Sequence, residues 1–584
     1  MSATLPQNKN LANIDDIPAS GTATPDVDAT LNGERTNEWE RPPPPPQPPA
    51  EKGLRFWLVI VAMMVTTFLS AIDLTSVSTA LPTIVQDLNG SEFAWVGSAF
   101  ALGSTAMLPL VGGLAQIFGR RPVVLGSIAF FALGSGLCGG AKGMDMLIAG
   151  RAVQGIGGGG ILAMAEIIVA DLVPLSERGN YMGIFGAVWA VASAIGPPIG
   201  GAFSQSNWRW LFYMNLPLTA IAAVLVWFCL TLKVPQDDLR TKMRRMDWTG
   251  NAIVIASTTI TVVALTWAGV KHSWGSAAVL APLIIGLVGT ALFFVWEAKG
   301  AVEPVVPWEL VNNRTALAGY LAVFLHGIVS TAVLYYLPVY FQASLEQGPV
   351  KSGITFFGNA FTIAPGAMIC GATAVAFNMY RPQNYVGWIL TTVGIGLLSL
   401  LKASSNKGMY IGFQIVEGFG LGILYTAPQF PVLAPIPVTE TAHALAFFTF
   451  VRSYAQTWGV TIGATILQNE LKRKLPPSFV EALTSTGGHG VEISYAAIPA
   501  IRVLEEPVKT QVKEAFASSL RIVWLVMAAL AALGTVTVLG MKELRLHEVT
   551  DEDWGLKEKK KLADAEQQAG AAAAAEKVKA TELE

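Results

Sequence analysis

Residues 54 to 81 read LRFWLVIVAMMVTTFLSAIDLTSVSTAL, an apolar block that contains a single acidic residue, Asp73. About 20 apolar residues are enough for a helix to cross ~30 Å of hydrocarbon, and this block is longer than that. The whole chain has the same character, because 52% of its 584 residues are hydrophobic and only 14% are charged. A typical soluble domain has about 25% charged residues. The sequence therefore predicts an all-α polytopic membrane protein.

Similar apolar blocks, bounded by charges, Pro or Gly, recur along the chain and predict fourteen transmembrane helices. The predicted spans are 55–81, 93–117, 122–141, 145–173, 179–203, 211–232, 247–269, 277–297, 315–342, 352–377, 384–402, 408–434, 441–468 and 519–541. An even number of spans places both ends of the chain on the same side of the membrane.

Lysine and arginine in the short loops predict the orientation. Eleven of them lie on the side of the chain ends and six on the opposite side, with the long segment 469–518 left out. Because cytosolic loops carry the excess of positive charge, both termini are predicted to be cytosolic. The sequon at Asn89 then faces the outside or a lumen and is a predicted glycosylation site, whereas the sequon at Asn313 faces the cytosol and is predicted to stay bare.

Several functions are disfavoured by motifs that the sequence lacks. No GxxxxGK[ST] stretch occurs, so the energy for transport is predicted to come from an ion gradient rather than from ATP. The chain also lacks an HExxH helix and a nucleophile elbow, and its 3 cysteines lie far apart, which predicts no enzyme activity, no cofactor and no metal site. A net charge of −2 gives no indication of a nucleic-acid partner.

Two glycine-rich helices resemble each other. Gln154-Gly155-Ile156-Gly157-Gly158-Gly159 aligns with Glu417-Gly418-Phe419-Gly420-Leu421-Gly422, which suggests an internal repeat of the kind found in many transporters. Chance similarity between two glycine-rich helices is the alternative. The first stretch also fits the GxGxxG dinucleotide pattern, but no strand precedes it, so its glycines are interpreted as sites of close helix packing.

Five ionisable residues lie well inside predicted spans: Asp73, Arg151, Glu166, Glu417 and Arg452. A charged side chain at mid-helix costs roughly 2.5–3.5 kcal/mol on insertion scales, so such residues usually face a partner or a cavity. All five are therefore candidates for the transport path and for proton coupling.

Depth along the helices allows one of these residues to pair with another. With a rise of ~1.5 Å per residue, Asp73 and Arg151 lie about 12 Å and about 9 Å below the outer ends of their helices. We expect an ion pair that protonation of the carboxylate would break, which is a possible coupling switch. A static ion pair that fixes two helices is the alternative. Glu166 lies about 22 Å from Arg151 along the same helix and cannot pair with it.

The family resemblance comes from the loop after the second span, Gly112-Gly113-Leu114-Ala115-Gln116-Ile117-Phe118-Gly119-Arg120-Arg121. It resembles the major facilitator motif between helices 2 and 3, except that Gln116 stands where the family usually has Asp. Glycines permit a tight turn there, and the arginines are expected to bond to a carboxylate such as Asp171.

Further matches resemble the fourteen-helix drug:proton antiporter branch of that family. Gly196-Pro197-Pro198-Ile199-Gly200-Gly201 resembles its antiporter motif, and the two prolines predict a bend or local opening of the helix. The segment Trp208-Arg209-Trp210-Leu211-Phe212-Tyr213-Met214-Asn215-Leu216-Pro217 resembles the entry to its sixth helix.

The resemblance implies the major facilitator fold and a monomeric, proton-coupled exporter of small organic molecules, with the lipid bilayer and protons as its other partners. Fungal efflux pumps for toxins and secondary metabolites in the plasma membrane look like this chain, and so do fungal vacuolar importers of basic amino acids. A non-transporting receptor on the same fold is a remote alternative. The predicted organisation is a disordered cytosolic tail (1–53), a six-helix bundle (54–232), two linker helices (233–300), a second six-helix bundle with a long outer loop at 469–518 (301–542), and a charged cytosolic tail (543–584).

Overall fold

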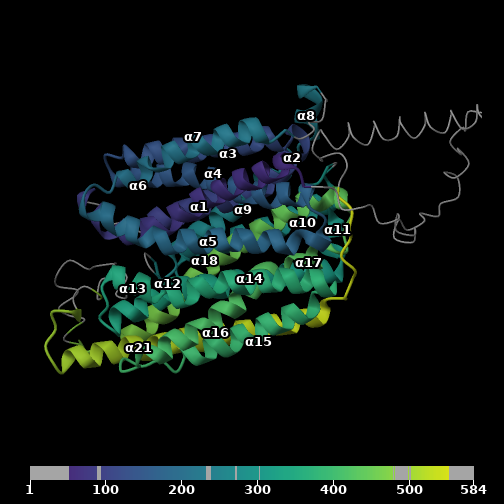
Figure 1. The fold of residues 1–584 in the computed structure, drawn as a ribbon. Helices are drawn as coiled ribbons and strands as arrows, with labels where there is room; N and C mark the ends of the chain where they lie inside the picture. The colour runs from purple at the N-terminus through teal and green to yellow at the C-terminus, as the bar shows by residue number, and fades with distance from the viewer. Residues whose placement is uncertain are drawn as a thin grey trace, which may run out of the picture. The chain divides into compact units, whose positions relative to one another are not determined.

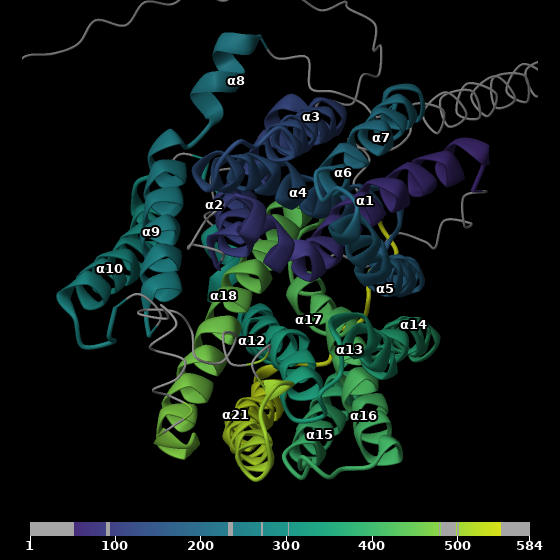
Figure 2. The same cartoon turned by 90° about the vertical axis from the view of Figure 1, so that its left-hand side faces the viewer.

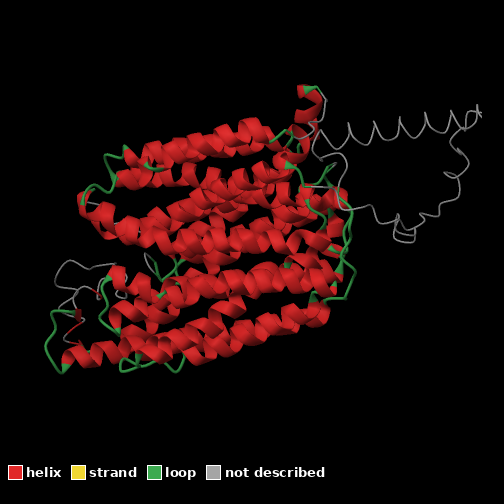
Figure 3. Cartoon of the chain, viewed as in Figure 1, coloured by secondary structure: helices red, strands yellow, loops and turns green. Residues whose placement is uncertain are grey.

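The structure, a computed structural model, describes residues 52–550 apart from 89–93, 232–237, 270–271, 302, 478, 480–497 and 499–500. Its ordered elements in that part of the chain are helices, with one isolated bridge between Ala268 and His272 (Figure 3). The predicted all-α class is therefore confirmed. The predicted glycosylation site at Asn89, the tail before residue 52 and the tail after residue 550 lie outside the described residues.

Helices of the N-terminal half coincide with the predicted spans. They are α1 (Leu54–Asp87), α2 (Ala94–Phe118), α3 (Arg120–Gly139), α4 (Met144–Leu172), α5 (Leu175–Gln205), α6 (Trp210–Tyr213) and α7 (Asn215–Cys229). The sixth span is made of α6 and α7, which meet at Met214. A short helix, α8 (Leu239–Arg245), then leads into the pair α9 (Trp248–Trp267) and α10 (Ala277–Lys299).

In its described part, the C-terminal half has as many long helices as the N-terminal half before α8, if α6 and α7 are taken as one span. Its elements are α11 (Trp308–Asn312), α12 (Arg314–Ala343), α13 (Pro349–Thr355), α14 (Phe357–Phe377), α15 (Arg381–Leu398), α16 (Lys407–Thr426), α17 (Gln429–Leu433), η3 (Val438–Glu440), α18 (Thr441–Lys474), α21 (Val508–Thr537) and η4 (Val538–Gly540). Two of these helices extend into the predicted outer loop, because α18 ends at Lys474 and α21 begins at Val508. Beyond its apolar part, α18 is stabilised by charged pairs one turn apart, such as Glu470 and Lys474 at 2.9 Å.

Length and composition give the described part of the chain 11 helices that can cross a membrane. The remaining three predicted spans correspond to α15, α16 and α18, which are long enough but more polar than the others. Gln414 and Glu417 lie inside α16, and Arg452 lies inside α18. The multi-pass membrane class is thus confirmed, and the count of fourteen stays a prediction.

The long helices form two bundles of like construction (Figures 1 and 2). In the N-terminal bundle α4 packs against α2 and α3, and α1 packs against α5 and α7. In the C-terminal bundle α16 packs against α14 and α15, and α12 packs against α18 and α21. The pair α9 and α10 lies beside them, and α9 contacts α2 and α18.

Close approaches at glycines support the internal repeat. A Cβ atom on Gly134 of α3 would lie 2.5 Å from Gln154 Cα, and a Cβ on Gly394 of α15 would lie 2.5 Å from Glu417 Cα. Backbones can approach this closely only where the side chain is a hydrogen atom. Because Gln154 and Glu417 are the residues that the sequence alignment pairs, the two halves repeat the same packing.

The two bundles meet closely at the end of the helices that holds the turn at Gly119, called here the Gly119 end. There a Cβ on Gly179 of α5 would lie 2.6 Å from Gly371 Cα of α14, and a Cβ on Gly112 of α2 would lie 2.8 Å from Ala446 Cβ of α18. These distances are shorter than van der Waals contact. The bundles are therefore closed against each other at the Gly119 end, which is the predicted cytosolic end.

A segment after α21, called here the C-terminal strap (residues 541–549), crosses between the bundles at this end; Figure 1 draws it in yellow beside the ends of the helices. On the C-terminal bundle, the Glu543 carboxylate accepts hydrogen bonds from the backbone N–H groups of Tyr380 and Arg381 at 2.8 and 3.2 Å. On the N-terminal bundle, the N–H of Ser176 donates to the His547 carbonyl at 3.2 Å. The strap thus joins both bundles.

Candidate functional site

The predicted ion pair between α1 and α4 is present. Arg151 Nη1 donates to Asp73 Oδ2 at 2.6 Å, and both side chains are fully buried. Gln154, three residues after Arg151, lies on the same face of α4, and its amide donates to Asp73 Oδ1 at 2.9 Å. A helical repeat of 3.6 residues therefore lets one face of α4 supply two donors to one carboxylate.

Two further helices complete this polar network. Asn215, the first residue of α7, donates to Asp73 Oδ1 at 2.8 Å. Ser135 of α3 accepts from Gln154 at 2.8 Å, and its own hydroxyl donates to the Phe131 carbonyl at 2.8 Å. Asp73, Arg151, Gln154, Asn215 and Ser135 thus form the N-bundle network. Its two charges balance, so it can lie in a low-dielectric interior.

The guanidinium of Arg151 also has partners that do not involve Asp73. Its Nε donates to the Val96 carbonyl at 3.1 Å, its Nη1 donates to Gln154 Oε1 at 2.6 Å, and its Cζ lies 4.5 Å from the centre of the Phe100 ring. Cation–π contact of this kind is favourable in a desolvated site. Loss of charge on Asp73 would therefore remove the ion pair, while the contacts of Arg151 with Val96, Gln154 and Phe100 remain.

Sequence reasoning missed three members of the network, and one of them, Gln154, was noted only for the internal repeat. Asn215 lies in the segment from Trp208 to Pro217 that resembles the entry to the sixth family helix, so a signal existed but pointed to no role. Ser135 gave no signal, since it is one of many small polar residues within an apolar span.

The antiporter motif lies against the same region of α1. A Cβ on Gly196 of α5 would lie 2.8 Å from Thr75 Cβ, two residues after Asp73. The helix α5 continues through Pro197 and Gly200 to Gln205, so the two prolines do not end it. Farther along, a Cβ on Gly201 would lie 3.4 Å from Val350 of α13. The motif therefore brings α5 close to the turn of α1 that carries the buried carboxylate.

The motif between α2 and α3 forms the predicted contacts at the Gly119 end. Gly119 has a φ of 90°, a left-handed conformation that favours glycine, and α3 begins directly after it. Arg120 donates through Nε and Nη2 to the two oxygens of Asp171 at 2.9 and 3.2 Å. Arg121 lies instead over the Trp227 ring, with its Cζ 4.4 Å from the ring centre.

Other positions of this motif contact neighbouring segments. A Cβ on Gly113 would lie 3.8 Å from Met246 Sδ, in the turn between α8 and α9. Gln116, which replaces the usual family Asp, donates to the Thr439 carbonyl of the C-terminal half at 3.0 Å. A carboxylate at this position could not donate that bond, so this chain forms a neutral contact between the bundles.

Two of the intramembrane charges join the bundles instead of entering the N-bundle network. Arg452 of α18 donates to Glu166 Oε1 of α4 at 3.3 Å, and Thr449 donates to Glu166 Oε2 at 3.1 Å. Arg452 also donates to the Tyr425 carbonyl at 2.9 Å. As expected, Glu166 does not pair with Arg151. Arg452 does not contact Asp73, and its partners Glu166 and Tyr425 lie near the Gly119 end.

The last intramembrane charge, Glu417, lies within the C-terminal bundle. It is fully buried, and the Asn359 amide of α14 donates a hydrogen bond to its Oε2. Among the described residues no Lys, Arg or His forms an ion pair with it, and its Oε1 has no hydrogen-bond partner. Glu417 therefore belongs neither to the N-bundle network nor to the contact between the bundles.

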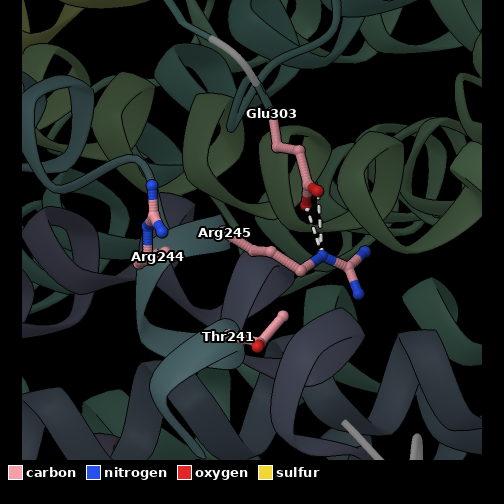
Figure 4. Close-up of a pocket in the computed structure, with 4 residues that line it drawn as sticks. All are labelled: Thr241, Arg244, Arg245 and Glu303. Atoms are coloured by element: carbon pink, nitrogen blue, oxygen red, sulfur yellow. Dashed lines mark hydrogen bonds and ion pairs between the residues drawn. The ribbon is translucent and has the colours of Figure 1, made fainter. Parts of the chain in front are cut away.

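A pocket lies outside these networks, at the linker that precedes α9 (Figure 4). It is lined by Thr241, Arg244, Arg245 and Glu303, and Arg245 Nε donates to the Glu303 carboxylate at 2.8 and 3.1 Å. No predicted site residue lines it.

Known proteins identify the architecture. Residues 63–460 match the model of the Major Facilitator Superfamily. The chain belongs to this superfamily. It is 40% identical over 520 residues to the "Efflux pump FUS6" of Gibberella fujikuroi, which covers 88% of this chain and 93% of that protein. It is 39% identical over 545 residues to the "MFS-type efflux pump LUC4" of a Fusarium species, which covers 92% of this chain and 96% of that protein.

A solved structure shows the same fold at low sequence identity. The human organic anion transporter MFSD10 superposes with a TM-score of 0.54 at 14% identity, over 84% of this chain and 100% of the other. The major facilitator assignment is thus confirmed together with the helical membrane architecture, and this chain is a multi-pass membrane transporter of that superfamily.

Proposed function

We propose that this chain is a proton antiporter that exports a small organic molecule from the cytosol, with Asp73 and Arg151 as the coupling pair. The observation that carries the proposal is the buried N-bundle network. Asp73 is its only acid, and a carboxylate that holds an arginine in a low-dielectric site changes the position of that arginine when it binds a proton. Export is supported by the two relatives that are named efflux pumps.

Coupling follows from the two states of the carboxylate. Ionised Asp73 accepts bonds from Arg151, Gln154 and Asn215, which draws α4 and α7 onto α1. A proton on Asp73 removes the ion pair, while Arg151 stays charged because arginine side chains are not deprotonated in proteins. The nearby approach of Gly196 to Thr75 links this change to α5, which contacts the other bundle through α14.

An isosteric variant tests the proposal. Reconstituted protein would be assayed for rhodamine 6G transport driven by an imposed pH gradient, with Asp73→Asn as the variant. Asp87→Asn is the matched control, since Asp87 lies at the end of the same helix, is half exposed and pairs with Arg209 at 3.0 Å. Gradient-driven transport is expected to be lost in Asp73→Asn alone, whereas exchange without a gradient is retained. Full pH-driven transport by Asp73→Asn would exclude the coupling role.

A separate experiment tests which cellular membrane contains the protein. A fluorescent fusion at the plasma membrane supports export from the cell. A fusion confined to the vacuolar membrane would instead favour uptake of basic amino acids into the vacuole.

A further inference from the structure

The C-terminal bundle holds a buried acid at the position that the N-terminal bundle gives to an amide. The close approaches of Gly134 to Gln154 and of Gly394 to Glu417 place both side chains at the same point of their bundles. A second pair of approaches has the same register: a Cβ on Gly157 would lie 2.7 Å from Phe131 Cα, and a Cβ on Gly420 would lie 2.6 Å from Thr391 N. The packing is repeated, but the chemistry is not.

Among the residues that the structure describes, the second bundle has no counterpart of the Arg151 charge beside its acid. Arg151 lies three residues before Gln154, whereas the residue three before Glu417 is Gln414. Gln414 is fully buried, its amide donates to the Tyr410 carbonyl at 2.8 Å, and its Oε1 has no hydrogen-bond partner. The repeat has therefore kept a polar side chain at both positions while moving the acid and removing the cation.

A buried carboxylate without a cation is strongly disfavoured in a membrane protein. Glu417 lies near the middle of α16, about 15 Å from the start of the helix at Lys407 and about 14 Å from its end at Thr426. From this depth the Glu417 side chain reaches neither water nor a lipid headgroup at either end of α16. The neutral acid avoids this cost, since protonation removes the charge that no cation balances.

We propose that Glu417 is a second proton-binding site, which holds a proton in this conformation and exchanges it with water when the bundles separate. The inference rests on the proposed antiport, since a proton held in the C-terminal bundle matters to transport only if protons are coupled to it. Asn359 and Gln414 are the polar side chains beside the site: Asn359 donates to the carboxyl group, and Gln414 lies one turn earlier on α16.

Infrared difference spectroscopy on the purified full chain tests the first part without any transported compound. The variant is Glu417→Gln, which keeps the shape of the side chain and has the residue found at position 154. Wild type minus Glu417→Gln is expected to contain the C=O band of a carboxylic acid at neutral pH. A carboxylate band in its place would overturn the proposal. The Asp73→Asn variant is expected to retain the Glu417 band, because that acid lies in the other bundle.

Exchange in heavy water tests whether the site opens. The acid band is expected to shift in D2O, and faster in Glu166→Gln, which weakens the contact of Glu166 with Arg452 between the bundles. An acid band that never shifts would show a static hydrogen bond and overturn the inference. These outcomes do not depend on the Asp73 experiment, so the two proposals fail separately.

Coupling stoichiometry gives the functional readout. With the membrane potential held at zero, each proton coupled to one rhodamine 6G contributes about tenfold to the limiting concentration ratio per unit of pH difference. Two protons give about 100-fold and one gives about tenfold, so Glu417→Gln is expected to reduce the ratio about tenfold. An unchanged ratio in a variant that transports normally would contradict the second site.

Discussion

Closure at the Gly119 end depends on glycine at position 179, and replacing it should open that end. A Cβ on Gly179 would lie 2.6 Å from Gly371 Cα and 2.7 Å from Gly371 O. Contact between carbon atoms is optimal at about 3.5–4.0 Å, so α5 and α14 would have to separate by about 1 Å. Overpacking of this size costs about 1–3 kcal/mol. Because the strain exists only while the bundles are closed, it shifts the equilibrium toward the open state by a factor of about 5–150.

The assay measures access to the surface between the bundles. Ala367 of α14 is buried and lies on this surface, because a Cβ on Gly186 of α5 would lie 3.4 Å from the Ala367 Cβ. In a chain without its native cysteines, Ala367→Cys should react with a water-soluble maleimide about 5–150 times faster when Gly179→Ala is also present. Gly186→Ala should have a much smaller effect, since its contact distance is ordinary.

Matched controls separate packing from helix propensity. Gly396 and Gly412 lie inside helices of the C-terminal bundle, and a Cβ on either meets nothing within 4 Å. Alanine at these positions should leave the labelling rate unchanged. If Gly179→Ala labelled no faster than Gly412→Ala, the closed contact would not control opening and the reasoning would be refuted.

Two further outcomes concern the Gly119 end. Arg120→Lys cannot make both bonds to Asp171, so it should lose about 1.5–3 kcal/mol of stability, seen as a lower midpoint of thermal unfolding in detergent. Arg244 is exposed, so Arg244→Lys should leave the midpoint unchanged. Burial, with help from Arg178, lowers the pKa of His547 to about 4. Its ordinary pKa is about 6.5, so the docked strap binds fewer protons than the released strap between those values. Docking of the strap should therefore be strongest above about pH 6.5 and weaken as the pH falls toward 4. Hydrogen exchange of the strap amides would detect this weakening, and His547→Gln should abolish the pH dependence.

Sequence reasoning succeeded where the spacing of residues along individual helices supplies the geometry. The rise per residue and the antiparallel course of α1 and α4 were enough to place Asp73 and Arg151 at one depth. It also excluded contact between Glu166 and Arg151, since both lie on α4. The aligned stretches containing Gln154 and Glu417 likewise depended only on spacing along two helices.

Contacts between the bundles could not be obtained in this way. Arg452 and Glu166 are 286 residues apart, and their meeting depends on how two bundles dock. The membership of Asn215 in the network also depends on the rotation of α7 after the break at Met214, which apolar periodicity does not set in a helix surrounded by apolar groups. Most of the strap lies in the stretch predicted as a charged cytosolic tail (543–584), since nothing in its sequence indicates that it bonds to backbone groups of both bundles.

The comparison of the two halves separates packing from chemistry. Glycines at equivalent positions keep α4 and α16 at the same close distance from their neighbours, so backbone geometry is preserved between the repeats. The side chains near those glycines are under no such restriction, and there the halves differ. In the N-terminal half Arg151 pairs with an acid on another helix, whereas among the described residues of the C-terminal half no arginine pairs with Glu417. An ion pair can respond to a proton by releasing its partner, whereas an isolated acid can only gain or lose charge. If both acids exchange protons, the N-terminal half converts protonation into movement and the C-terminal half sets how many protons each cycle requires.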